Sequence, residues 1–408
     1  MAMQSSRCAR FAAGICMALL MGVGTCPARQ SAAPASSSSS SSDPRVLFAK
    51  GEAALRSGDL DAAGAAFRKV LLVDPRAGSA YANLGVIAMR RKQWDAALPL
   101  LRKAEKLEPT MTGVRLNIGL VNFRRGDYAG AIAPLTSVVR DQPDSTQARY
   151  LLGLCKLFTE HYADAVSTLE PLWPQTSNDI MYLYALGIAA HNAGRKELDE
   201  KALKRLVEVG GDTPEFHLIL GKAYLNREEA EKSVPELERA ESSAPNMPFL
   251  HFGLGVAYLQ MHDNERAEAE FLKEIAIEPD LPDIYEQLGE LYLKLEKDDE
   301  AEKWLREALR RNPKMPASLF GLAKIHLQQE KYQQALNEID AALRLAPSSK
   351  NVHFIRGRIL MKLGRREEAE KEMLTVQRLS EASTEKVIES TSMNDKRVRN
   401  PELAQPPQ

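Results

Sequence analysis

The chain has 408 residues, of which 54 are Lys or Arg and 55 are Asp or Glu, so its formal net charge is −1. This balance lacks the strong basic excess of nucleic-acid-binding proteins and argues against a nucleic-acid partner. Hydrophobic residues make up 44% of the chain, close to the average of globular proteins, but aromatic residues only 6%. Such a composition favours helices over sheets, because strands prefer aromatic and β-branched side chains.

The N-terminus has the pattern of an export signal. Arg7 and Arg10 give it a positive start. The apolar run 11–23 that follows is shorter than the roughly 20 apolar residues of a membrane-spanning helix. Small residues then predict cleavage after Ala28, so residues 1–28 are expected to be a signal peptide. The mature chain is expected to be periplasmic or secreted.

Two alternatives to cleavage stay open. One is an uncleaved membrane anchor, and the other is a lipoprotein with its lipid on Cys26, because the residues before it partly resemble a lipobox. Membrane association is expected only through one of these two routes. Residues 29–43 are expected to be a flexible linker, because the serine tract Ser36–Ser42 has nothing to bury. Beyond residue 28 the only cysteine is Cys155, so the mature chain is expected to form no intrachain disulfide.

A period of 34 residues runs through the rest of the chain. Stepping by this period from residue 51 meets glycine every time except at Ala323, and the glycines are Gly51, Gly85, Gly119, Gly153, Gly187, Gly221, Gly255, Gly289 and Gly357. With this residue at position 8 of a repeat that begins at Pro44, position 20 is mostly alanine, position 24 mostly leucine and position 32 mostly proline. The ten repeats are 44–77, 78–111, 112–145, 146–179, 180–213, 214–247, 248–281, 282–315, 316–349 and 350–383.

This pattern, with aromatic residues near positions 4, 11 and 17, resembles the tetratricopeptide repeat family. The resemblance implies an all-α fold, an α-solenoid of tandem helix–turn–helix repeats that form a right-handed superhelix. One helical hairpin cannot bury its apolar faces alone, so stability comes from stacking neighbours. The segment 384–408 is expected to be a cap followed by a disordered tail, with a short capping helix around Glu381 to Glu389.

Local signals mark the ends of the helices. Glycine at position 15 of several repeats predicts a left-handed residue that ends the first helix, and these glycines are Gly58, Gly126, Gly194 and Gly364. Asp59 and Asp127 follow at once and are candidate N-caps of the second helix.

The middle of the array departs from the pattern. Pro171 and Pro174 fall inside the expected second helix of the fourth repeat, and Asp199 replaces the position-20 alanine of the fifth. An aspartate at a tight helix contact needs a partner, because burying an unpaired charge is costly. We expect a hinge or a kinked segment between Pro171 and Gly211, and ordinary sequence drift is the alternative.

The sequence carries no catalytic motif. It has no Gly-Lys-Ser or Gly-Lys-Thr phosphate loop, no His-Glu-x-x-His and no Cys-x-x-Cys. His217, His251 and His353 occupy position 4, where structural packing is the expected role and a metal pair from the first two is the alternative. Cys155 is expected to be a small buried hydrophobic residue. We therefore expect no enzyme activity, catalytic residue, cofactor or metal.

The resemblance implies that positions 2, 5, 9, 12 and 13 of each first helix line a concave groove. The candidate protein-binding residues are Leu116, Leu120, Phe123, Tyr150, Leu154, Leu157, Phe158, Tyr184, Ile188, Phe252, Val256, Asp283, Glu286 and Glu290. They predict an apolar N-terminal half and a charged C-terminal half, with Leu120, Leu154 and Ile188 forming a continuous exposed stripe. The alternative is that superhelix packing or the tail covers these residues.

Taken together, the sequence predicts a non-enzymatic scaffold or adaptor that binds a protein or peptide in its groove, in the bacterial envelope. The alternative function is an accessory subunit that holds a polysaccharide-export or glycosyltransferase machine.

Overall fold

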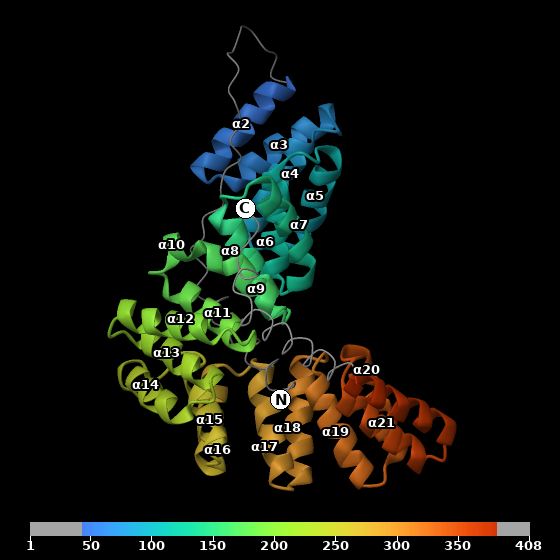
Figure 1. Cartoon of the computed structure of the whole chain (residues 1–408). Coiled ribbons are helices and arrows are strands. Elements are labelled where there is room, and N and C mark those ends of the chain that lie inside the picture. Colours follow the sequence, from blue (N-terminus) through green and yellow to red (C-terminus); the bar gives the residue numbers. More distant parts are fainter. Residues whose placement is uncertain (1–42, 382–408) are drawn as a thin grey trace, which may run out of the picture. The chain divides into compact units, whose positions relative to one another are not determined.

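The computed structural model describes residues 43–381, and within them the backbone forms helices joined by short turns, without strands (Figure 1). These residues fall into two compact parts, 43–240 and 241–381. The first part contains α2 (Pro44–Ser57), α3 (Leu60–Val73), α4 (Gly78–Arg90), α5 (Trp94–Leu107), α6 (Thr112–Arg124), α7 (Tyr128–Asp141), α8 (Thr146–Phe158), α9 (Tyr162–Leu169), η2 (Glu170–Leu172), α10 (Trp173–Thr176), α11 (Ile180–Asn192), α12 (Lys196–Val209) and α13 (Pro214–Asn226). The boundary falls within α14 (Ala230–Ser243). The second part contains α15 (Leu250–Gln260), α16 (Asn264–Ile277), α17 (Pro282–Lys294), α18 (Asp298–Arg311), α19 (Pro316–Gln328), α20 (Tyr332–Leu345), α21 (Lys350–Lys362) and a last helix over residues 366–381.

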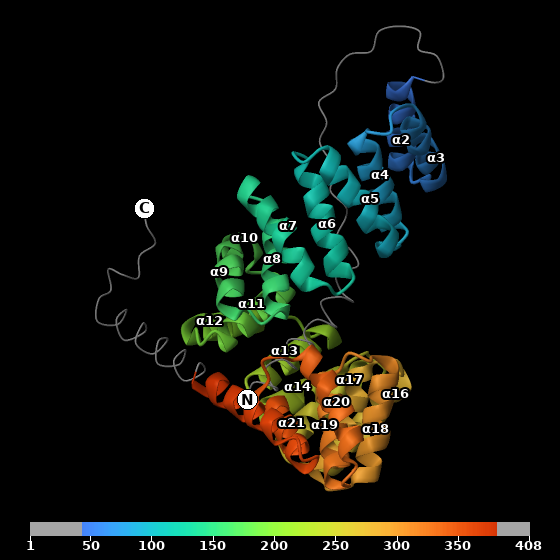
Figure 2. The ribbon, with the colours of Figure 1, turned by 90° about the vertical axis from the view of Figure 1, so that its right-hand side faces the viewer.

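Consecutive helices pack as pairs within each part, for example α4 with α5 and α17 with α18. Figure 2 shows the same side-by-side arrangement for α17 to α21. The first helix of each pair begins at the first residue of a 34-residue repeat, except α15, which begins two residues late at Leu250. The sequence period is therefore a structural period, and the predicted all-α solenoid of helix–turn–helix repeats is confirmed.

The predicted helix caps are present. The φ angle is 84° at Gly58 and 77° at Gly364, in the left-handed region that ends a helix. Position 15 is also left-handed where it is not glycine, at Lys92, Glu160, Glu228, His262, Glu296 and Glu330. Asp59 accepts a hydrogen bond from the amide of Ala62 at 2.9 Å, and Asp127 accepts one from Gly130 at the same distance, which confirms both N-caps.

The core of each repeat forms where its two helices meet. In the second repeat, Ala97 at position 20 and Leu101 at position 24 are completely buried. A Cβ atom on Gly85 would lie 2.7 Å from Cδ2 of Leu101, which is too close for any side chain. The glycine at position 8 therefore lets the leucine of the second helix press against the backbone of the first.

The second helix of the fourth repeat is broken, as its prolines predict. It continues from α9 through the 3₁₀ turn η2 into the single turn α10, with Pro171 and Pro174 near the starts of the last two segments. Proline lacks the amide hydrogen and cannot continue the ladder of helix hydrogen bonds. The kink is confirmed at residues 170–176, whereas α12 is a regular helix and a hinge function stays a prediction.

Asp199 finds the partners that its burial requires. Its side chain is 10% exposed and pairs with the guanidinium of Arg227, which is 7% exposed. Nδ1 of His191 lies 3.1 Å from its second oxygen. A buried ion pair thus replaces the alanine contact and connects the fifth repeat to the sixth.

The predicted signal peptide, residues 29–42 of the predicted linker and the segment 384–408 lie outside the described residues, whereas Asp43 is the N-cap of α2. Between residues 43 and 381, no helix combines the length and the apolar character needed to cross a bilayer.

Candidate functional site

Most of the predicted groove residues are buried. The buried ones are Leu120, Phe123, Leu154, Leu157, Tyr184, Ile188, Phe252 and Glu286. Those that stay partly exposed are Leu116, Tyr150, Phe158, Val256, Asp283 and Glu290. The expected exposed stripe is wrong, because Leu120, Leu154 and Ile188 are only 7%, 0% and 1% exposed.

Packing between first helices explains this burial. In the first part, α6 contacts α4 and α8, and α11 contacts α8 and α13. A side chain at position 9 of a first helix is therefore enclosed by the first helices of the repeats on either side. Leu120, Leu154 and Ile188 belong to one hydrophobic cluster, and this supports the alternative that solenoid packing covers them.

Aromatic rings fill the same region between the third and fourth repeats. The ring of Phe158 lies 4.7 Å from that of Tyr128 and 6.1 Å from that of Phe123, measured between centroids. Phe123 and Tyr128 meet edge to face at 5.4 Å. Such contacts stabilise the stacking of repeats. These aromatic residues therefore contribute to the core between the two repeats.

The three acidic groove residues predicted in the eighth repeat differ in their exposure to solvent. Glu286 is 3% exposed and accepts hydrogen bonds from the amide and hydroxyl of Ser318, at 3.1 and 2.9 Å. It therefore links α17 to α19 and is closed to a ligand. Asp283 and Glu290 keep part of their surface exposed.

Large apolar side chains are instead exposed in the tenth repeat. Phe354, Met361 and Leu374 are 46%, 54% and 58% exposed. They line a pocket of about 740 Å³ between α21 and the last helix, together with the partly buried Met373. Residue 354 is at position 5 and residue 361 at position 12, so both occupy groove positions. No later repeat follows among the described residues, and these positions remain open.

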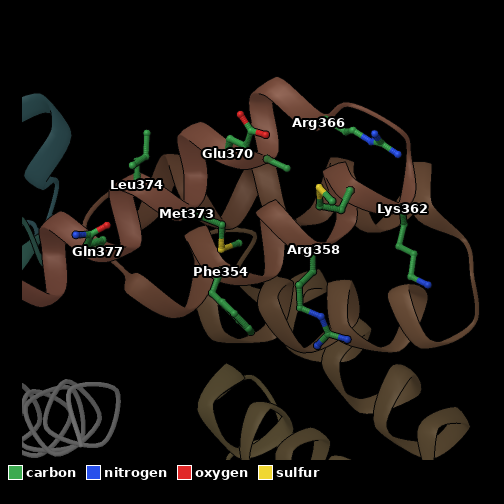
Figure 3. Close-up of a pocket in the computed structure, with 10 residues that line it drawn as sticks. Phe354, Arg358, Lys362, Arg366, Glu370, Met373, Leu374 and Gln377 are labelled. Atoms are coloured by element: carbon green, nitrogen blue, oxygen red, sulfur yellow. The ribbon is translucent and has the colours of Figure 1, made fainter.

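The rim of this pocket is basic. Figure 3 shows Arg358 and Lys362 on α21 and Arg366 at the start of the last helix, with Glu370 as the acidic residue of the lining. None of the three cations pairs with a carboxylate of the described chain. The pocket therefore combines an apolar lining with a basic rim.

The largest exposed apolar side chains at groove positions therefore lie in the tenth repeat, and not in the third to seventh repeats that the sequence pattern favoured. In those repeats neighbouring helices bury most of the apolar groove residues, among them Leu120, Leu154 and Ile188. The available signal was the place of the tenth repeat: no further repeat follows it within residues 43–381, so no described helix covers Phe354 or Met361 as the inner repeats cover each other.

The position-4 histidines each pair with a glutamate at position 23. Nδ1 lies 2.6 Å from Glu236 in His217, 2.7 Å from Glu270 in His251 and 2.5 Å from Glu372 in His353. In His251 and His353 the other ring nitrogen lies 2.8 and 2.9 Å from the carbonyl of a position-32 proline. These rings therefore connect the two helices of one repeat to the turn before them.

The environment of His217 favours its charged form. Burial opposes the charge, but the hydrogen bonds to Asp212 and Glu236 outweigh it and raise the pKa of the ring.

Cys155 is completely buried, and burial raises the pKa of its thiol to about 12. A thiol of this kind is neutral at physiological pH and is a poor nucleophile.

Comparison with known families identifies the fold. Two models described as "Tetratricopeptide repeat" match residues 48–111, 184–248 and 252–316, and residues 122–189. Together they match more than half of the chain. The chain belongs to the tetratricopeptide repeat family. A third model, "Anaphase-promoting complex, cyclosome, subunit 3", matches residues 294–376.

Solved structures with a similar fold share little sequence with this tetratricopeptide repeat chain. Yeast Tom70 is 14% identical with a TM-score of 0.41, and the match covers 88% of this chain and 99% of that one. A tetratricopeptide repeat protein from Parabacteroides merdae is 14% identical with a TM-score of 0.47, covering 61% of this chain and 98% of its own. Among curated proteins, no sequence matches this chain.

Proposed function

We propose that this chain is a non-enzymatic scaffold of the bacterial envelope that binds an acidic amphipathic helix of a partner protein in the pocket of the tenth repeat. The observation that carries the proposal is the exposed apolar pocket lined by Phe354, Met361 and Leu374. Single exposed apolar residues are ordinary, but a contiguous group in a hollow is a common mark of an interaction site.

The spacing of the apolar residues suits a helical partner. Phe354 and Met361 lie seven residues apart on α21, so they share one face of the helix two turns apart. Met373 and Leu374 of the last helix line the same pocket. A groove between two helices accepts the apolar face of a third, through side chains spaced by one or two turns.

The charged side chains around the pocket favour an acidic partner. Arg358, Lys362 and Arg366 line the pocket, and Glu370 is the only acidic residue of its lining. An acidic helix gains attraction at this rim, whereas a basic helix meets repulsion. Because the rim is exposed to solvent, the attraction is expected to weaken as salt increases.

The test uses a fluorescein-labelled peptide with leucines at helical spacing and glutamates on its other face. We expect the full chain to bind it and affinity to fall with salt. The double variant Arg358→Glu, Arg366→Glu should weaken binding by at least about tenfold, because two attractive contacts become repulsive. Fluorescence anisotropy measures the dissociation constants.

The matched control is Arg68→Glu, Arg76→Glu, which makes the same charge change on two exposed arginines of the first repeat. It should bind like the wild type. Equal loss in both double variants would mean that binding follows net charge, and no loss in either would place the peptide elsewhere. Both outcomes would remove the tenth-repeat pocket from the proposal.

The envelope location is supported by the N-terminal sequence, namely Arg7, Arg10 and the short apolar run 11–23. We expect the mature protein to begin at Arg29. N-terminal sequencing of the protein from its native host checks this. Retention of residues 1–28 would contradict cleavage, and a lipid on Cys26 would replace it by the lipoprotein alternative.

A further inference from the structure

Three side chains converge where the sixth repeat meets the seventh. Glu241 lies near the end of α14, His251 on α15 and Glu270 on α16. Nδ1 of His251 is 2.7 Å from a carboxylate oxygen of Glu270 and 3.9 Å from one of Glu241. One possible ligand atom of each residue lies within 4.8 Å of the other two. Two carboxylates therefore share one imidazole nitrogen.

The second ring nitrogen of His251, Nε2, also has a hydrogen-bond partner. Nε2 lies 2.8 Å from the carbonyl oxygen of Pro245. A carbonyl only accepts hydrogen bonds, so Nε2 carries a hydrogen and donates it. Nδ1 lies 2.7 Å from Glu270, and a carboxylate also only accepts, so Nδ1 donates a hydrogen to Glu270. A cation bound between the two carboxylates would take the place of this hydrogen. Metal-binding histidines are oriented in this way, with the second ring nitrogen donating to a carbonyl or carboxylate.

The second carboxylate, Glu241, distinguishes this site from its structural equivalents. His217 and His353 have the same pairing of Nδ1 with a position-23 glutamate. Glu241 is at position 28 of its repeat, and the residues at this position before the other two histidines are Val207 and Leu343. His217 has its second carboxylate, Asp212, on the opposite ring nitrogen, 2.8 Å from Nε2. Among these three histidines of the described chain, only His251 therefore has a second carboxylate within 4 Å of Nδ1.

Lys273 also pairs with the two carboxylates. Its ammonium nitrogen lies 2.8 Å from Glu270 and 3.4 Å from Glu241, and its side chain is 50% exposed. A half-exposed lysine can turn into solvent without breaking the core. A tetrahedral ion with bonds of about 2.0–2.2 Å holds its ligand atoms roughly 3.3 Å apart, which is between the shortest and longest separations here.

We propose that Glu241, His251 and Glu270 form a binding site for a divalent transition-metal ion of the zinc class, which displaces Lys273 and joins the sixth repeat to the seventh. One imidazole and two carboxylates suit zinc and leave its fourth position to water. Because the ligands come from three helices, binding stabilises the folded junction.

The test titrates Zn²⁺ into the chelator-treated full chain by isothermal calorimetry. We expect one equivalent to bind, and binding to raise the melting temperature. Glu241→Leu, which installs the residue type of the ninth repeat, should weaken binding by about a hundredfold or more, since even outer-shell losses cost 10–100-fold. Lys273→Gln should strengthen binding, because it removes the competing cation.

Glu372→Gln is the matched control, since it alters the equivalent pair in the tenth repeat, and it should leave binding unchanged. Lys273→Gln separates metal binding from a purely structural ion-pair network, which gives no reason for tighter zinc binding in this variant. The proposal is overturned if the wild type takes up no zinc, or if Glu241→Leu binds it as the wild type does. Circular dichroism verifies that each variant is folded.

Discussion

The triple variant Leu120→Asp, Leu154→Asp, Ile188→Asp is expected to lose cooperative unfolding and much of its helical circular dichroism. The three side chains are 7%, 0% and 1% exposed and lie in one hydrophobic cluster. Each substitution would place an unpaired carboxylate where no cation pairs with it, and such changes are among the most destabilising single mutations, at about 4 kcal/mol or more. Three together cost about 12 kcal/mol or more, which is comparable to a typical folding free energy of about 5–15 kcal/mol.

The control for this variant is the triple Leu72→Asp, Val73→Asp, Val207→Asp. These residues lie in the same part of the chain but are 83%, 54% and 49% exposed. The control adds the same charge and should remain folded. A Leu120, Leu154, Ile188 variant that kept its helicity and its unfolding midpoint would show that these positions face solvent and restore the groove predicted from sequence.

Gly289→Leu is expected to destabilise the second part of the chain by about 1–3 kcal/mol or more. A Cβ atom there would lie 2.5 Å from Cδ2 of Leu305 and 3.2 Å from its backbone nitrogen. The backbone atom cannot move aside as a flexible side chain would, so α17 and α18 must separate. Urea denaturation followed by circular dichroism measures the loss.

Gly364→Ala serves as the comparison, because it tests conformation without contact. Residue 364 has a φ of 77°, and a Cβ atom there would have nothing within 4 Å. The cost should be about 1 kcal/mol, from the left-handed backbone alone. If Gly289→Leu cost no more than Gly364→Ala, the close helix approach at position 8 would be refuted.

The repeat fold could be predicted because its signals are local and recur. A glycine every 34 residues fixes where two helices touch, and Gly58 or Asp59 marks the end of one helix and the start of the next. Pro171 and Pro174 likewise indicated that the second helix of the fourth repeat is broken. Each of these effects acts within a few residues of its cause.

The exposed surface could not be predicted in the same way, because burial depends on what lies beside a helix. The residue at position 9 is buried in the fourth repeat, where it is Leu154, but exposed in the tenth repeat, where it is Arg358. Both residues belong to the first helix of their repeat. The difference is that α8 has neighbouring first helices on both sides, whereas α21 has one only on the side of α19 among the described helices. The meeting of Glu241 with His251 and Glu270 was also hidden, since it depends on three helices packing together.

The proposed binding pocket is tested most directly by site-specific photocrosslinking from position 354 in the native host. A benzoylphenylalanine there would replace Phe354, whose ring is exposed in the pocket, and position 72 provides the control site because Leu72 is exposed far from any pocket residue in sequence. The account predicts an adduct from position 354, and not from 72, that maps to an acidic amphipathic helix of another protein. Adducts that map only to residues 382–408 of this chain, or no adduct at all, would contradict it.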